Sequence, residues 1–238
     1  MGVIQNISQH MVNISGGVRY IGDIDHIYKP FFYYYNRIPV TRVRISDFKL
    51  CDHPVTEAEW DAVMGGHSVS LLPKVNVSWF DAINFIQELN RQTGLKYRLP
   101  TEAEWEFAAR GGARNRANYL FAGSRILMEV GWYKVNSKSS RRPVMQLLPN
   151  QLGLYDMSGN VWEWCSDWYY RDYAHGASHL FDDDDPVLDP HGPSIGKERV
   201  LRGGSFGNDE KHCWIFWREK EKPEKVFNSV GFRLAMTA

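Results

Sequence analysis

Alternating apolar and polar residues predict β-strands in the first fifty residues. Over residues 38–50, valine, isoleucine and phenylalanine alternate with polar neighbours, which is the period-2 pattern of a half-buried strand. Residues 11–23 alternate on both sides of a Gly16-Gly17 pair. Because Gly-Gly between two such runs is typical of a tight turn, we expect a β-hairpin over residues 11–23.

Two capping boxes predict helices. The phrase Thr-Glu-Ala-Glu-Trp begins at Thr56 and again at Thr101, so in each case a threonine caps the helix and a glutamate three residues later reaches back to it. The first helix should end at Gly65-Gly66 and the other at Gly111-Gly112. The residues flanking the two phrases differ. This favours two independent uses of the same capping sequence rather than an internal duplication.

A third helix is expected between these two, from Trp79 to about Gln92, with Gly94 as its stop signal. Helical spacing places one apolar stripe on it. The stripe consists of Phe80, Ile83, Phe85, Ile86 and Leu89.

The second half of the chain carries no comparable helix signal. After residue 112, short aromatic runs alternate with Gly, Asn, Pro and Ser, which predicts short strands joined by ordered loops. The fold class is therefore α+β, with two to three helices in the N-terminal half. No linker-like stretch divides the chain, so we expect a single domain over residues 1–238.

Charge and cysteine content narrow the function classes. The chain of 238 residues has 28 basic and 28 acidic side chains, so no net charge favours nucleic acid or an anionic membrane. No signal peptide and no span of about 20 apolar residues is visible, which predicts a soluble protein, with the cytoplasm favoured. Three cysteines fit a reducing compartment, although Cys165 and Cys213 remain a pair that could bridge.

Several phrases occur in an order that identifies a family. They are Val55-Thr-Glu-Ala-Glu-Trp60, Tyr97-Arg-Leu-Pro-Thr-Glu-Ala-Glu-Trp105, Gly153-Leu-Tyr-Asp-Met-Ser-Gly-Asn-Val-Trp-Glu-Trp164, Arg199-Val-Leu-Arg-Gly-Gly-Ser205 and Gly231-Phe-Arg-Leu-Ala235. Together they resemble the formylglycine-generating enzymes, or sulfatase-modifying factors. The resemblance covers nearly the whole chain and is nearest to the short bacterial members, including retroelement variable proteins. It implies an irregular C-type-lectin-like fold.

The resemblance also implies copper-dependent oxidation of a sulfatase cysteine, with one departure. Enzymes of the family hold copper with two cysteines five residues apart, and Cys213 matches the second of them, with Ser205 and Trp162 beside it. The position of the first cysteine is Asn208. Because soft thiolates hold Cu(I) and amides do not, we expect a non-catalytic protein without copper.

A ligand-binding role is the alternative that the family offers. Its variable members display side chains between Gly-Gly-Ser and Gly-Phe-Arg, so we expect a protein or saccharide to bind the face formed by residues 206–228. The candidate contacts are Asn208, Asp209, Lys211, Trp214, Phe216, Trp217, Arg218, Glu219, Lys220, Phe227 and Asn228. If Trp214 and Phe216 face the core of a strand, Trp217 faces outward. The remaining alternatives are the oxidase itself and a sensor domain of a larger bacterial protein such as a kinase.

A calcium site is also implied by the resemblance. Family members bind Ca²⁺ in the turn that corresponds to Asp156, Gly159, Val161 and Glu163, and oxygen ligands from a tight turn suit this ion. The acidic run Asp182–Asp185 is a weaker candidate for a cation and is expected to be a solvated loop.

Overall fold

The computed structural model describes residues 2–24, 40–115, 117–171 and 185–238. The helices are α1 (Val3–Ile7), the 3₁₀ turn η1 (Ser8–His10), α2 (Glu57–Met64), α3 (Trp79–Thr93), α4 (Glu102–Ala109), α5 (Leu127–Val130) and the 3₁₀ turn η2 (Glu210–Cys213). The strands are β1 (Met11–Ile14), β2 (Gly17–Ile21), β3 (Thr41–Ile45), β4 (Phe48–Cys51), β5 (Tyr97–Arg98), β6 (Trp162–Trp168), β7 (Val187–Leu188), β8 (Arg199–Arg202), β9 (Arg218–Glu221), β10 (Val230–Phe232) and β11 (Ala235–Thr237).

The N-terminal strands pair with residues 41–51 and not with each other. β1 pairs with β4 and β2 with β3, both antiparallel and in one continuous register that runs from Met11 opposite Cys51 to Ile21 opposite Thr41. The hairpin expected over residues 11–23 is therefore wrong. Gly16 instead lets the backbone of β3 pass close to it, because a Cβ on Gly16 would lie 2.1 Å from the carbonyl oxygen of Ile45.

The three expected helices are confirmed, each with a complete capping box. The caps are Thr56 for α2, Ser78 for α3 and Thr101 for α4. α2 and α3 end at Gly65 and Gly94 in the left-handed conformation. The short helix α1 was not expected, so the N-terminal half has one helix more than predicted.

The apolar stripe expected on α3 is correct except at its first position. Phe85, Ile86 and Leu89 are buried, whereas Phe80 is 51% exposed and lies outside the core. The buried face of the helix packs against α2 and β5. Phe80 instead lies against Trp79 on the helix surface.

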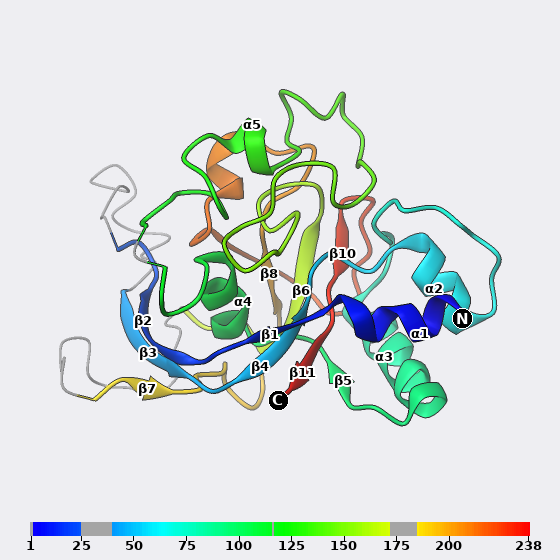
Figure 1. Ribbon diagram of the computed structural model, residues 1–238, viewed down its shortest axis with the longest axis horizontal. Helices are drawn as coiled ribbons and strands as arrows, with labels where there is room; N and C mark the ends of the chain where they lie inside the picture. Colours follow the sequence, from blue (N-terminus) through cyan, green and yellow to red (C-terminus); the bar gives the residue numbers. More distant parts are fainter. Residues whose placement is uncertain (1, 25–39, 116, 172–184) are drawn as a thin grey trace.

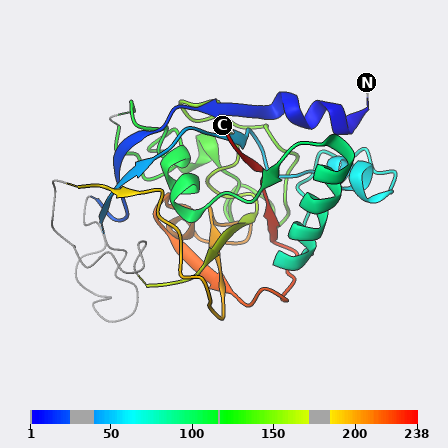
Figure 2. The same ribbon diagram turned by 90° about the horizontal axis from the view of Figure 1, so that it is seen from below.

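The described residues form three sheets, and α4, which is buried along its whole length, packs against strands of two of them, β2 and β3 in one and β6 and β8 in the other. The strand orders are β1-β4-β11-β5, β10-β6-β8-β9 and β2-β3-β7. Figures 1 and 2 show α1, α2 and α3 gathered at one end of the molecule and α4 lying between the N-terminal strands and β6 and β8. Beyond α5, the described residues of the second half are short strands and loops, as an irregular α+β fold requires.

Buried ion pairs fasten α4 and the central sheet together. Glu106 of α4 accepts from Arg202 of β8 at 2.5 Å, and neither side chain is exposed. Glu163 of β6 pairs with Arg233, which follows β10, through two hydrogen bonds of 2.6 Å. Buried charges are costly unless they are paired and hydrogen-bonded, so these pairs require the elements to meet in one arrangement.

The structure bears on two further expectations, one about membrane-spanning helices and one about the acidic run at residues 182–185. In the part of the chain that the structure describes, no helix is long and apolar enough to cross a membrane. Residues 182–184 of the acidic run lie outside the described residues, and Asp185 is exposed.

Replacing Arg233 tests the importance of the buried pairs. Arg233→Met leaves the Glu163 carboxylate buried without its guanidinium, and we expect the free energy of unfolding to fall by about 3–5 kcal/mol in urea denaturation. The double variant Arg233→Met/Glu163→Gln should recover part of this loss, because it buries no ion. Arg91→Met, which removes the exposed partner of Glu88, is the matched control and should unfold with the parent. An Arg233→Met protein as stable as the parent would contradict the argument.

Candidate functional site

The segment between β8 and β10 begins with a turn that packs on Cys213. Gly203 and Gly204 both have positive φ, and a Cβ on Gly204 would lie 2.8 Å from the sulfur of Cys213. Ser205 follows and donates a hydrogen bond of 2.6 Å from its hydroxyl to Oδ1 of Asn208. Cys213 thus packs against the turn that begins at Gly203, and Asn208 in this turn has a polar partner of its own.

Cys213 is fully buried among Phe121, Leu127, Val130 and Tyr133. Burial raises the pKa of its thiol to about 12, with a smaller contribution from a nearby glutamate. At neutral pH the group is therefore a thiol and not a thiolate, the form that attacks substrates and binds metals.

The three cysteines are all buried free thiols, so the pairing of Cys165 with Cys213 is not present. Cys165 packs in the cluster that surrounds α4, whereas Cys213 packs beside α5. The two residues belong to different parts of the core, and this separation is why a bridge does not form.

Three of the expected ligand contacts are core residues. Phe216, Trp217 and Arg218 are each less than 8% exposed, so the expectation that Trp217 faces outward is wrong. The physical reason is that β9 begins only at Arg218, so the alternation of a strand does not apply to the residues before it. Trp217 packs edge-on against His212, with ring centroids 4.8 Å apart.

Arg218 is likewise used internally. Its guanidinium donates hydrogen bonds of 2.6 and 2.7 Å to the carboxylate of Glu102 on α4. Trp162, the other expected lining residue, is also buried, at 7% exposure on β6. The side chains that the sequence offered as hot spots therefore stabilise the fold.

The remaining candidates lie on the surface in two groups. Asp209 and Lys211 are exposed on the turn around η2, where Asn208 and Trp214 are half-buried, and Asp209 pairs with Lys134 at 3.2 Å. The second group is the 219–228 strip, which consists of β9 after Arg218 and the loop that follows it. Its candidates are Glu219, Lys220, Phe227 and Asn228, of which Glu219 is half-buried and the others are exposed.

Hydrogen bonds from the start of α3 and from the segment before it hold the loop of the 219–228 strip in place. The amide of Trp79, the first residue of α3, donates to the carbonyl of Pro223 at 3.0 Å, and the amide of Asn76 donates to that of Phe227 at 3.0 Å. At the other end of the strip, Lys220 pairs with Glu198 at 2.8 Å. The backbone is thus anchored while Val226 and Phe227 remain 52% and 38% exposed.

The expected calcium turn is buried and already carries protein hydrogen bonds. The Glu163 carboxylate accepts three, from Trp105 at 2.7 Å and from Arg233 at 2.6 Å twice. Asp156 accepts from the Met145 amide at 2.9 Å and from the Asn160 side chain at 3.2 Å. Burial raises the pKa of Asp156, and Arg233 opposes this shift. Glu163 therefore serves in the core as the ion-pair partner of Arg233. The sequence motif did not indicate this role.

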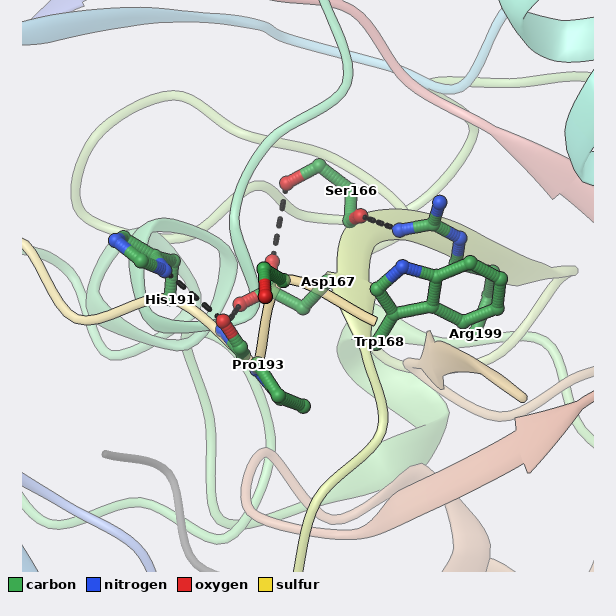
Figure 3. Close-up of a pocket in the computed structure, with 8 residues that line it drawn as sticks. Ser166, Asp167, Trp168, His191, Pro193 and Arg199 are labelled. Carbon is green, nitrogen blue, oxygen red and sulfur yellow. Dashed lines mark hydrogen bonds between the residues drawn. The ribbon is translucent and has the colours of Figure 1, made fainter. Parts of the chain in front are cut away.

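A pocket of about 250 Å³ at the end of β6 was not anticipated (Figure 3). Arg199 lies between two indoles, 3.8 Å from the ring centre of Trp79 and 3.5 Å from that of Trp168. Burial raises the pKa of Asp167 in its wall to about 6. Ligand pockets usually enclose roughly 300–1,000 Å³, so this pocket is small for one. In the sequence, the one sign of this pocket was the polar pair Ser166-Asp167, which stands between Trp164 and Trp168.

Comparison with known families decides the relationship. Residues 3–238 match the model of the family described as "Sulfatase-modifying factor enzyme 1-like domain". The chain belongs to this family. The resemblance stated from the sequence motifs is thereby confirmed for essentially the whole chain.

Three relatives show how the family domain is distributed. The formylglycine-generating enzyme of Streptomyces coelicolor is 38% identical over 181 residues, which cover 70% of this chain and 53% of that enzyme. The serine/threonine-protein kinase pkn1 of Chlamydia pneumoniae is 34% identical over 175 residues, covering 68% of this chain and 24% of the kinase. Among solved structures, Treponema denticola variable protein 1 superposes with a TM-score of 0.80 at 28% identity, covering 96% of this chain and 95% of that protein.

The matches to the curated enzymes cover only part of those enzymes. The chain spans about half the length of the curated formylglycine-generating enzymes that it matches, 53% for the Streptomyces protein and 50% for that of Mus musculus. In contrast, it matches the Treponema variable protein over almost the full length of both chains.

Proposed function

We propose that this chain is a non-catalytic member of the family that binds a protein partner through the 219–228 strip. The observation that carries the first part is the state of Cys213. It is a single buried thiol with a pKa raised to about 12, and the position five residues before it is an amide that bonds to Ser205. Cu(I) in proteins is selected by soft thiolate and thioether ligands, and this donor set does not fit the ion.

The chemistry of the surface favours a protein over a saccharide. Of the aromatic candidates, Phe216 and Trp217 are buried and unavailable for stacking on a sugar ring, and Phe227 is 38% exposed. The 219–228 strip instead combines acidic and basic side chains with two exposed apolar residues, Val226 and Phe227. An apolar centre with a charged rim is the usual composition of a protein interface.

A role as a regulatory module of a larger protein is a second candidate. The kinase of Chlamydia pneumoniae matches this chain over only 24% of the kinase's own length. A domain of this family can therefore be one part of a longer chain. In such a setting, the 219–228 strip would contact either another domain or a separate partner.

An oxidation assay tests the loss of catalysis. The full chain is incubated with Cu(I), oxygen and a peptide containing Cys-x-Pro-x-Arg, and the product is followed by mass spectrometry. We expect no formylglycine, because Cys213 lacks a second thiol and does not ionise. The formylglycine-generating enzyme of Streptomyces coelicolor, assayed in parallel, is the positive control. Conversion of the peptide by the present protein would overturn the non-catalytic assignment.

Paired surface variants test the binding strip. The parent protein, Val226→Ser/Phe227→Ser and the control Ile195→Ser are immobilised and exposed to an extract of the organism's own proteins. Ile195 is 82% exposed and lies outside the strip. We expect a captured protein that is retained by the parent and by Ile195→Ser but reduced about tenfold or more by the double variant. Equal capture by all three proteins would contradict the proposal, and so would a glycan-array signal that depends on the same two residues.

We also propose a structural Ca²⁺ in the turn that contains Asp156 and Glu163. Two buried carboxyl groups, those of Asp156 and Glu163, lie near the guanidinium of Arg233, and burial raises the pKa of Asp156, so a bound cation would favour its ionised form. A carboxylate has about four acceptor positions, of which Glu163 uses three. The carbonyls of Gly159 and Val161 would complete the oxygen ligands that this ion prefers. The bound ion would stabilise the turn.

Thermal unfolding with and without a chelator tests this calcium site. We expect EGTA to lower the melting temperature of the parent and added Ca²⁺ to restore it, since an ion that binds only the folded state stabilises it. In Asp156→Ala the response to Ca²⁺ should disappear, whatever the stability of the variant. Glu163 is unsuitable for this test because it holds Arg233. A parent protein whose melting temperature responds to neither EGTA nor Ca²⁺ would refute the site.

A further inference from the structure

Two histidines and an aspartate, His10, His53 and Asp52, lie close together just beyond the end of the antiparallel pairing of β1 with β4. The register that sets Met11 opposite Cys51 places His10 opposite Asp52 one step further along. The amide of Asp52 donates to the carbonyl of His10 at 2.9 Å, and the carbonyl of Asp52 accepts from Tyr155 at 2.7 Å. Because Asp52 is tied on both sides of its backbone, its carboxylate is held in a fixed position.

The imidazoles of both histidines face this carboxylate. Nδ1 of His10 lies 3.0 Å from Oδ2 of Asp52, and Nδ1 of His53 is hydrogen-bonded to Oδ1. β4 ends at Cys51, so the chain has left the strand when it reaches His53, and this side chain turns toward the same point as its neighbour. The two rings lie edge to face with centroids 4.7 Å apart, and the ligand atoms of the three residues all lie within 4.8 Å of one another.

A second carboxylate fixes the orientation of the buried imidazole. Nε2 of His53 lies 3.3 Å from Oε1 of Glu59, and Oε2 of Glu59 accepts from both the amide and the hydroxyl of Thr56 at 2.8 Å. Histidines that bind metals usually have their other ring nitrogen held by a carboxylate in this way. The capping box of α2 therefore also determines that Nδ1 of His53 faces Asp52.

We propose that His10, Asp52 and His53 bind a Zn²⁺ ion. Two imidazole nitrogens and one carboxylate oxygen are a donor set that zinc uses in proteins, whereas Ca²⁺ and Mg²⁺ prefer oxygen alone. Zinc–ligand lengths of about 2.0–2.1 Å place tetrahedral ligands about 3.3 Å apart, and the ligand atoms of the three residues all lie within 4.8 Å of one another, with Nδ1 of His10 3.0 Å from Oδ2 of Asp52. Zn²⁺ would take the place of the hydrogen bond between His53 and Asp52.

The burial of the three residues gives the site one open side. The side chain of His53 is 5% exposed and that of Asp52 is 15% exposed, whereas that of His10 is 37% exposed. The ion can therefore enter past His10 and keep a water molecule as its fourth ligand. Bound zinc would fasten η1, and with it α1, to the end of β4, which makes the site a structural clamp on the N-terminal segment. This inference does not depend on the proposed binding function.

Calorimetric titration of the full chain, carrying no histidine tag, with Zn²⁺ tests the site. We expect one ion per chain in the parent, with binding weakened about tenfold or more in His10→Ala. His67→Ala is the matched control, since His67 is exposed and lies outside the cluster, and it should bind as the parent does. Equal binding by His10→Ala and the parent would overturn the proposal, as would no saturable binding by the parent.

A second variant and a second readout protect the test against loss of folding. Asp52→Asn keeps the shape of the side chain but removes its charge, and it should weaken Zn²⁺ binding as His10→Ala does. Replacing zinc by Co²⁺ gives visible absorption bands that report the ligands directly. We expect these bands in the parent and in His67→Ala and their loss in both cluster variants. Bands that persist unchanged in His10→Ala would place the ion elsewhere and refute the assignment.

Discussion

The pairing of buried carboxylates with buried guanidinium groups is the constraint on which the rest of this structure depends. α4 is buried all round although it carries three glutamates, and two of these are satisfied by arginines that arrive from β8 and β9. Glu163 depends in the same way on Arg233. A helix of this composition is stable in a protein interior only when its partners are in place, so the irregular second half of the chain is ordered around it.

This constraint also explains why residues that look functional are structural. Arg218, Trp217 and Glu163 belong to residue types that are common at interfaces and metal sites, and in this protein they hold α4, η2 and β10 in register. The exposed candidates lie on the turn around η2 and on the 219–228 strip, and backbone hydrogen bonds from Trp79 and Asn76 hold the loop of that strip. Cys213 itself contributes apolar packing and no charge to this scaffold.

Local signals in the sequence predicted local structure well. The capping boxes at Thr56 and Thr101 and the stop at Gly94 are interactions among residues within a few positions, and each formed as expected. The pairing of residues 11–21 with 41–51 was missed because Gly16-Gly17 has the composition of a turn, and only the approach of Ile45 shows its real use. The burial of Trp217 was missed because it depends on where β9 begins, which is decided by contacts with distant residues. The His10, Asp52 and His53 cluster was missed for the same reason, since a register between distant strands creates it.

The position of β11 carries a consequence for how the protein is made. This strand, formed by Ala235–Thr237, lies between β4 and β5 in the first sheet, so two strands from the first half of the sequence are joined by one that is far from them in sequence and is translated after them. Until the ribosome delivers these residues, β4 has an unpaired edge of the kind that invites association with other chains. Contacts so distant in sequence close slowly. The newly made chain is therefore exposed to aggregation between the synthesis of β4 and that of β11, and a chaperone that covers the edge of β4 would protect it during this interval.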